Sequence, residues 1–337
     1  MNSLSLKTTI ADTGAKTHFF IFFASVAVSL VALWLERRVG IAWNYHPDAT
    51  TYATKAFEQY YAIKDAGLWR VFNNGHFLLS ALFSQNVVTL TAINIALFAL
   101  TNNILFHNQK RFFANTNLKS WIVLAMLLLS PYRIHLSTTI LKDTIIIFLL
   151  VVVLCSKFAK YPAFALLLIW RTPAILYLAL KKPAAVKLKS FIKPLLWAAP
   201  IVIVLTIIFW QPLFAYLNAT NSTMMAFREF DSVPSFANLG IAGMGVRALL
   251  WPIFAIFGIF FVISPALAYF PLFLGAASMV IYNFFVHRST SVHWVSFIPL
   301  AIIAAAAPGF TTYFRYAFPI LVCLPIYLGN QKKQSNK

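Results

Sequence analysis

The chain has 337 residues, of which 61% are hydrophobic and only 10% are charged, and its mean hydropathy is +0.78. Soluble globular proteins have about 25% charged residues, and no soluble core could bury this much apolar surface. The composition therefore excludes a soluble protein and predicts an integral membrane protein. The net charge of +19 comes from Lys and Arg in short segments between apolar runs. Nucleic-acid binding would need these charges on one soluble face, so we expect lipid headgroups or a lipid pyrophosphate as the anionic partner and no nucleic acid.

Apolar runs separated by short polar segments divide the whole chain. Because about 20 apolar residues cross a bilayer, we expect an all-α, polytopic helical bundle with about eight to ten transmembrane helices, forming one transmembrane domain over residues 1–337. Charged residues follow the first run without a small-residue cleavage site, so we expect a retained helix and not a cleaved signal peptide. The clear runs are 18–36, 76–106, 120–131, 140–156, 195–216, 266–286, 294–308 and 317–329.

The distribution of Lys and Arg predicts the orientation of these helices. Residues 107–119, 181–194 and 330–337 are rich in Lys or Arg, which is typical of cytoplasmic segments. Residues 37–75 and 217–247 are then the two large outer loops. Most of the acidic residues fall at the outer face in this topology, so we expect the chemistry there. These acids are Glu36, Asp48, Glu58, Asp65, Asp143, Glu229 and Asp231.

Two runs differ from a simple span. Run 161–180 carries Arg171-Thr-Pro at its centre, and we interpret it as a re-entrant hairpin with Arg171 near its tip, because a broken helix is tolerated where it lines a cavity. Run 248–264 is interpreted as an interfacial or re-entrant segment on the outer side. The alternative, in which both runs cross fully, also satisfies the orientation. In the first outer loop, the spacing of Ala, Tyr and charged residues over 48–61 predicts an amphipathic helix lying on the membrane.

Asp48 is the candidate catalytic residue. It follows Tyr45-His46-Pro47 at the start of the first outer loop. Asp48 could cap the helix that follows, or its carboxylate could take a proton from a sugar hydroxyl at the membrane surface, and one residue can do both. His46 could bind a metal beside Asp48, but no second His–carboxylate pair in the sequence supports a metal site, so none is expected.

Basic residues are the candidates for substrate binding. Arg133 and Lys142 could hold a lipid pyrophosphate, or they could pair with Asp143 and reach toward headgroups. Arg171 could bind substrate or pair with carbonyls freed at the helix break. Arg247 and Arg315 could bind substrate or serve as anchors in an aromatic belt.

The remaining polar groups of these apolar segments have structural interpretations. His135 is interpreted as a packed interfacial histidine. Cys155 and Cys323 both lie in apolar runs, so we expect buried thiols that form neither a disulfide nor a metal site.

The order of these motifs carries a family resemblance. An outer Asp follows the first span, Asn-Gly leads into the second, and Ser-Pro, Ser-Thr and Lys-Asp follow. Arg-x-Pro, Arg-x-x-x-Trp-Pro and Tyr-x-Arg-Tyr-x-x-Pro come later. This order resembles polytopic GT-C-like glycosyltransferases and the repeat-unit polymerases of bacterial surface polysaccharide and O-antigen. The resemblance covers most of the chain, although this chain is short for such enzymes and its first loop has a single Asp at Asp48 in place of a paired Asp-Asp or Asp-Glu.

The resemblance implies an enzyme of lipopolysaccharide or related polysaccharide biosynthesis in the bacterial inner membrane. It would transfer sugar at the outer face from an undecaprenyl-(pyro)phosphate-linked saccharide. Asp48 would correspond to the family's first-loop acid. The basic loop residues would be Arg133, Lys142, Arg171 and Arg315, and Arg247 is a further candidate for the same role. We expect no cofactor, although a divalent metal stays open, and other polysaccharide-assembly membrane proteins are expected partners.

The alternative function is a polysaccharide transporter or lipid-linked-sugar flippase. Such a protein would use Arg171 and the broken run 161–180 as a substrate site at the midplane of the bilayer. A non-catalytic scaffold would not need seven acidic residues on one face.

Overall fold

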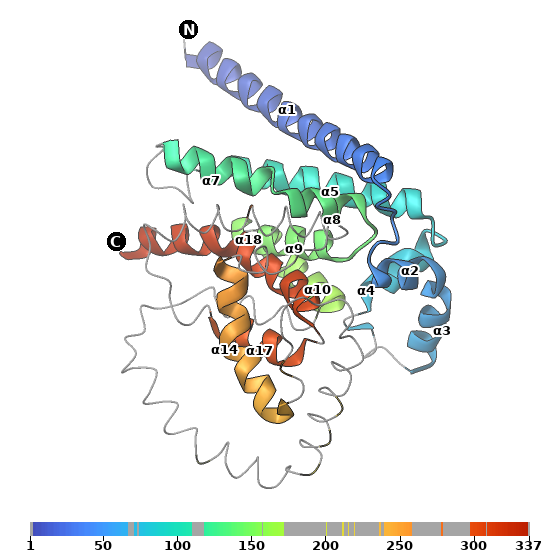
Figure 1. The fold of residues 1–337 in the computed structure, drawn as a ribbon. Helices are drawn as coiled ribbons and strands as arrows, with labels where there is room; N and C mark the ends of the chain where they lie inside the picture. The colour runs from blue at the N-terminus through green and yellow to red at the C-terminus, as the bar shows by residue number, and fades with distance from the viewer. Residues whose placement is uncertain are drawn as a thin grey trace. The chain divides into compact units, whose positions relative to one another are not determined.

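The computed structural model describes residues 3–66, 71–72, 74–109, 118–156, 158–171, 239–257, 297–307 and 309–335, together with a few isolated positions. These residues form α-helices and no strand (Figure 1), which confirms the all-α prediction for this part of the chain. The chain divides into two compact units, Met1–Ile175 with Val322–Lys337 and Leu176–Leu321. The predicted loop 181–194 and the apolar runs 195–216 and 266–286 lie outside the described residues, apart from isolated positions.

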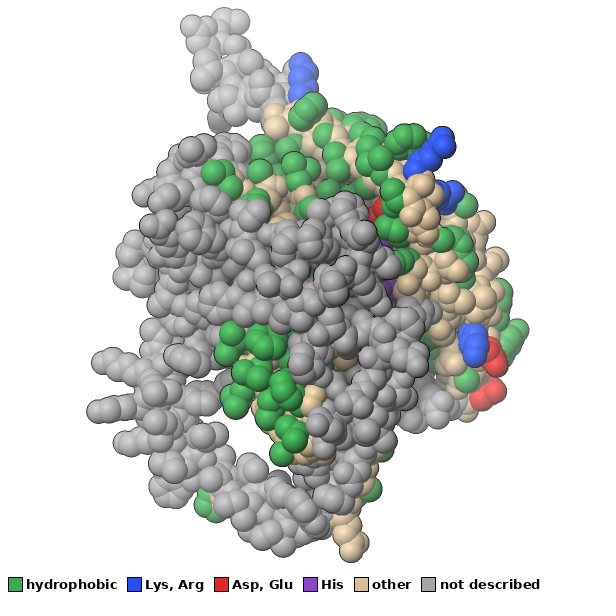
Figure 2. All heavy atoms as spheres, in the orientation of Figure 1, with side chains coloured by type: hydrophobic (Ala, Val, Ile, Leu, Met, Phe, Trp, Pro, Cys, Tyr) green, Lys and Arg blue, Asp and Glu red, His purple; other side chains and the backbone are tan. Residues whose placement is uncertain are grey.

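Helix α1 (Ser3–Arg38) begins well before the apolar run 18–36 that predicts it. It packs along α5 (Val87–His107) (Figure 1). Residues Lys16–Arg38 and helix α5 are each long and apolar enough to cross a membrane. Only 11% of the most apolar stretch of α1 is buried, and Figure 2 shows hydrophobic side chains over much of the described surface in this view. A bilayer would cover such a surface, so these helices indicate a membrane protein.

The first predicted outer loop contains two helices where we expect one. Helices α2 (Pro47–Thr54) and α3 (Ala56–Ala66) are separated at Lys55, where the backbone N–H bonds to the Thr51 carbonyl and closes α2. Both helices pack against α4 (Gly75–Leu82). Ala49, Tyr52 and Ala56 are buried in this packing, whereas the aromatic side chains of α3 are exposed, namely Phe57, Tyr60 and Tyr61.

The predicted run 76–106 is also divided. Helix α4 ends at Leu82 and α5 begins at Val87, with Ser84 and Gln85 in the left-handed region at φ 52° and 58°. The Asn86 side chain caps α5 by accepting the Thr89 backbone N–H at 3.0 Å. Gly75 lets α4 approach its neighbour closely, because a Cβ there would lie 2.7 Å from the Ile169 side chain.

Short helices follow α5 in the first unit. They are α7 (Leu118–Leu128), α8 (Pro131–Thr138), α9 (Asp143–Cys155) and α10 (Lys160–Trp170). Two of them, α8 and α9, are largely buried. Helix α8 contacts α1, α5 and α9, while α9 pairs with α10. At about 1.5 Å per residue, α9 and α10 are about 20 and 16 Å long, so each is shorter than the roughly 30 Å hydrocarbon layer.

The second unit contains α14 (Ile241–Phe257), α17 (Phe297–Ala306) and the first part of α18 (Phe310–Ser335). Helix α14 packs on α17. Helix α14 begins inside the predicted outer loop 217–247, seven residues before the run 248–264 that we interpret as interfacial, so the end of that loop is helical.

Candidate functional site

Between His18 and Glu36, helix α1 carries its polar side chains on one face. His18, Ser25, Ser29 and Glu36 are separated by 7, 4 and 7 residues, and these spacings return to the same side of a helix with 3.6 residues per turn. Ser29 Oγ lies 2.9 Å from Ser137 Oγ of α8. The stripe therefore faces the buried helices, while the other residues of α1 between His18 and Glu36 are apolar.

Glu36 is the first member of a buried chain of proton-bearing groups. Its Oε1 lies 2.8 Å from His135 Nδ1, and its Oε2 accepts the Thr138 hydroxyl at 2.6 Å. His135 Nε2 lies 2.9 Å from His46 Nε2. Because a carboxylate accepts, Nδ1 of His135 carries the hydrogen. The two facing Nε2 atoms share one hydrogen between them. We call Glu36, His135 and His46 the histidine relay.

Aromatic rings surround the histidine relay and restrict water around it. The Tyr45 ring meets the rings of His46 and His135 edge-on, with centroids 5.1 and 5.8 Å away. Tyr132 stacks beside His135 at 6.1 Å. His135 is 1% exposed while the Glu36 side chain is 15% exposed. The centre of the relay is thus dry, and this strengthens its hydrogen bonds. The acid at one end of the relay is part-exposed.

The joint between α8 and α9 fixes the position of His135. Three consecutive carbonyls there have left the helical pattern, and side chains of α4 and α5 satisfy all three. Asn94 Nδ2 donates to Thr139 and Leu141 at 2.7 and 2.9 Å, and His76 Nε2 lies 2.6 Å from the Ile140 carbonyl. Buried backbone acceptors at a helix break need such partners.

Asp48 is half-buried in the first turn of α2, one residue after Pro47. The cap position is occupied by His46, whose side chain makes no capping hydrogen bond. The structure therefore places Asp48 inside the helix and not at its cap, where a negative charge still interacts favourably with the helix dipole. His46 links the segment that carries Asp48 to the histidine relay.

Arg171 directly follows α10, and Asp143 begins α9. Arg171 Nη1 donates to Asp143 Oδ1 at 3.3 Å, and the two side chains are 6% and 1% exposed. This ion pair joins the start of α9 to the end of α10, so the two helices run antiparallel. The sequence alternatives for Arg171 and Asp143 did not include this pairing. The return arm of the predicted hairpin, residues 172–180, lies outside the described residues.

Arg133 and Lys142 occupy different environments within the first unit. Arg133 is buried, donates to the Leu127 carbonyl and lies over the Phe98 ring at 4.9 Å. These contacts favour a packing role for Arg133. Lys142 precedes α9 and is half-buried, so it is the more accessible of the two cations.

Arg247 and Arg315 belong to the second unit. Arg247 is buried, lies over the Trp251 ring at 5.7 Å and donates to the Ala305 carbonyl at 3.5 Å. Arg315 is buried and lies over the Tyr316 ring at 5.2 Å. Both side chains contact aromatic rings inside the protein, and both alternatives for them, substrate binding and an interfacial anchor, stay predictions.

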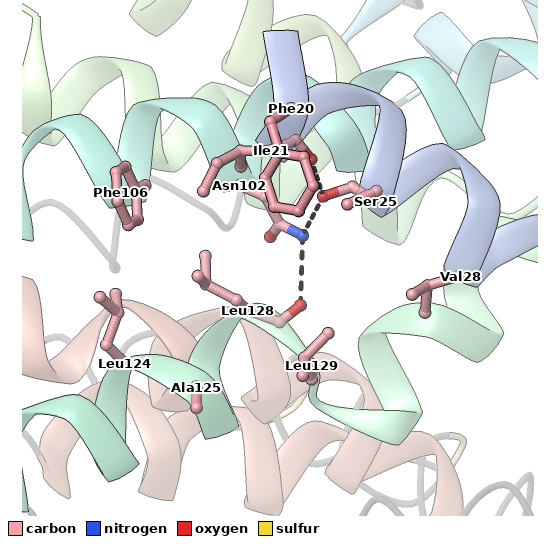
Figure 3. Close-up of a pocket in the computed structure, with 11 residues that line it drawn as sticks. Phe20, Ile21, Ser25, Val28, Asn102, Phe106, Leu124, Ala125, Leu128 and Leu129 are labelled. Carbon is pink, nitrogen blue, oxygen red and sulfur yellow. Dashed lines mark hydrogen bonds between the residues drawn. The ribbon is translucent and has the colours of Figure 1, made fainter. Parts of the chain in front are cut away.

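An apolar cavity of about 240 Å³ lies between α1, α5 and α7 (Figure 3). Phe20, Val28 and Leu124 are among its lining residues. A hydrogen-bonded polar side chain lies among these apolar residues. Asn102 Nδ2 donates to Ser25 Oγ at 3.0 Å and to the Leu128 carbonyl at 3.2 Å. The cavity can hold an apolar chain.

Metal-binding and redox chemistry have few candidate groups. In the part of the chain that the structure describes, no three His, Cys, Asp or Glu side chains form a group that could hold a metal. Cys155 and Cys323 are both buried, which confirms the burial predicted for the two thiols.

The sequence alone did not connect His135 with Glu36 or with His46, because 99 residues separate His135 from Glu36 and 89 separate it from His46. The 7-4-7 spacing on α1 is the signal that could have found Glu36. No protein-family model, no curated protein and no solved structure matches the chain. The resemblance to surface-polysaccharide glycosyltransferases therefore rests on the motifs of the sequence.

Proposed function

We propose that the protein is a multi-pass glycosyltransferase of the bacterial cytoplasmic membrane. It acts at the outer face on sugars linked to a polyprenyl pyrophosphate, as a polymerase of surface-polysaccharide repeat units. In this reaction the acceptor hydroxyl attacks the donor sugar at C1, the bond from C1 to the phosphate oxygen breaks, and the electron pair leaves with the pyrophosphate. The hydroxyl proton must pass to a base.

The observation that carries the proposal is the gathering of proton acceptors where the first outer loop meets α8. Half-buried Asp48 lies two residues from His46, and His46 joins His135 and Glu36. A hydroxyl that attacks a sugar needs such a group, and proton-transfer catalysis contributes roughly 10²–10⁴-fold to a rate.

Two further features suit a polyprenyl-linked donor. Half-buried Lys142 supplies a cation close to the end of α8, as a leaving pyrophosphate needs. The apolar cavity is lined by α1 residues 20–28, which lie about 12–24 Å along the helix from Glu36. A lipid with its pyrophosphate near Glu36 would have its isoprenoid chain at this depth.

The test is sugar transfer by the full chain in lipid nanodiscs. The donor is the polyprenyl-pyrophosphate-linked saccharide extracted from cells in which the gene is deleted, and products are separated by chain length. Asp48→Asn should lower kcat/KM by at least about tenfold, because a charge-assisted hydrogen bond to substrate is lost. Asp65→Asn is the matched control, since Asp65 is an exposed acid of the same loop. No transfer by the wild-type protein would refute the function, and full activity of Asp48→Asn would remove Asp48 from the site.

A lipid-linked-sugar flippase is the second candidate, and it would have to use Arg171, which is buried at the end of α10 and paired with Asp143. In liposomes, a flippase would expose a labelled lipid-linked sugar on the opposite leaflet without lengthening it. A glycosyltransferase would lengthen the saccharide in detergent, where no leaflets exist.

A further inference from the structure

We propose that His46, supported by His135 and Glu36, is the group that takes the proton from the acceptor hydroxyl, with Asp48 holding the acceptor sugar. This inference rests on the proposed function. It changes the role assigned to Asp48 from the sequence and gives roles to two residues, Glu36 and His135, that the sequence left without one in catalysis.

The geometry of the histidine relay fixes where its protons lie. Glu36 Oε1 holds the hydrogen on His135 Nδ1 at 2.8 Å, so the other ring nitrogen of neutral His135 has only a lone pair. His46 must then donate from Nε2 across the 2.9 Å contact. The Nδ1 atom of neutral His46 is therefore basic. The Glu36 carboxylate is one hydrogen bond from His135 and two from His46, and it sets the tautomers of both rings. Carboxylates that contact catalytic histidines act in the same way.

This arrangement stabilises the proton after it arrives. When His46 accepts the acceptor proton, its Nε2 hydrogen can move to His135 Nε2. The positive charge then lies on the ring that contacts Glu36, and the Thr138 hydroxyl holds the other carboxylate oxygen at 2.6 Å. An ion pair in this dry, aromatic-lined place is stronger than in water. In each transfer the acceptor oxygen forms one bond to C1 of the donor sugar, and the bond from C1 to the pyrophosphate oxygen breaks. The proton of the acceptor hydroxyl enters the relay.

The choice between Asp48 and His46 follows from environment and chemistry. An imidazole ordinarily titrates closer to neutral pH than a carboxylate, which suits a general base. His46 is 6% exposed and hydrogen-bonded to a second ring, whereas Asp48 is half-buried at the start of α2. A more exposed carboxylate is suited to accepting hydrogen bonds from several sugar hydroxyls.

The alternative is a structural clasp that only fastens the first outer loop to α8. Glu36→Gln separates these roles, because the amide oxygen can still accept the His135 Nδ1 hydrogen but cannot neutralise an imidazolium. A relay predicts that kcat falls about tenfold with KM unchanged, the difference between a charge-assisted and a neutral hydrogen bond. A clasp predicts an unchanged kcat in correctly folded protein.

The decisive experiment measures kcat and KM for His46→Asn, Glu36→Gln and Asp48→Asn in nanodiscs. His46→Asn should lower kcat by about 10²–10⁴-fold, more than Asp48→Asn does. His18→Asn is the matched control, because His18 lies 18 residues from Glu36 on α1, about 27 Å along the helix. If Asp48→Asn abolishes transfer and His46→Asn stays within about twofold of wild type, Asp48 is the base and the inference is overturned while the function stands.

A spectroscopic measurement tests the relay without any transfer. The protein has seven histidines, so 15N-labelled histidine gives a solid-state NMR spectrum that can be assigned with His46→Asn and His135→Asn. We expect a 15N–15N coupling across the shared hydrogen of the two Nε2 atoms and an Nδ1-protonated His135. Absence of both signatures would overturn the relay even if the wild-type protein transfers sugar. Their presence with no transfer would overturn the proposed function instead.

Discussion

Two of the buried polar clusters in the described part of the first unit are built differently. Arg171 and Asp143 form an ion pair whose side chains are 6% and 1% exposed, across the ends of two antiparallel helices. The histidine relay contains one acid and two rings, with a chain of hydrogen bonds from part-exposed Glu36 to His46. The ion pair has opposite charges that cancel within the cluster. The relay can gain or lose a proton without breaking its contacts.

This difference separates structural from chemical use of buried charge. Breaking a buried ion pair leaves an unpaired charge in an apolar place, so the cost falls on folding. Replacing the acid of a hydrogen-bonded histidine chain by an amide leaves neutral groups that still form hydrogen bonds. Folding is then little affected, and the loss falls on the stability of the protonated imidazole.

The largest effect is expected at the ion pair. Asp143→Asn leaves the Arg171 guanidinium buried beside a neutral amide, and the free energy of unfolding should fall by about 3–5 kcal/mol. Thermal unfolding of the purified protein in detergent, followed by circular dichroism, measures this change. The double variant Asp143→Asn with Arg171→Met should regain most of the loss, because it no longer buries a charge. Equal stability of Asp143→Asn and wild type would show that the pair stabilises nothing.

The joint between α8 and α9 should have an intermediate effect on both clusters. Asn94→Leu leaves the Thr139 and Leu141 carbonyls without their side-chain donor, and we expect a loss of about 2 kcal/mol. Hydrogen exchange at α8 and α9 amides should rise together, because Asn94 holds the segment between them. Thr89→Ala is a control on the same helix, since the Thr89 contact with Asn86 uses its backbone N–H and survives the change. Unchanged exchange in Asn94→Leu would mean that the joint holds without this side chain.

Metal removal should have the smallest effect. Both ring nitrogens of His135 already form hydrogen bonds, one with Glu36 and one with His46, so a metal could bind this ring only by displacing one of these partners. Dialysis against a chelator should leave the transfer rate unchanged. Loss of activity that is restored by a divalent cation would contradict the proton relay, because His46 and His135 would then be ligands.

The long helices of the fold could be predicted because apolar length alone decides them. Runs 18–36 and 76–106 predict helices that the structure contains as α1 and α5. The break at Ser84-Gln85-Asn86 could not be placed from apolarity, since Leu82 and Phe83 continue the run up to it. The polar residues Ser84, Gln85 and Asn86 can be recognised as a helix break and a cap only after the structure shows the turn.

The candidate site was only partly predictable for a related reason. His46, Asp48 and His135 stand out in an apolar sequence, but their partners depend on which helices pack together. Glu36 meets His135 because α1 packs on α8, and Arg171 meets Asp143 because α10 returns along α9. Those contacts join residues 99 and 28 positions apart, and no local pattern fixes them. The predicted membrane orientation, with residues 181–194 inside, stays a prediction.

The most direct measurement compares His46→Asn and Asp143→Asn in the same nanodiscs, recording kcat for sugar transfer and the thermal unfolding midpoint of each. The account predicts opposite outcomes: His46→Asn loses about 10²–10⁴-fold in kcat with its midpoint near that of wild type, while Asp143→Asn loses stability and its folded fraction retains most of the rate. If the two variants lose rate and stability in the same proportion, the histidine relay is a structural contact like the ion pair, and the central claim is contradicted.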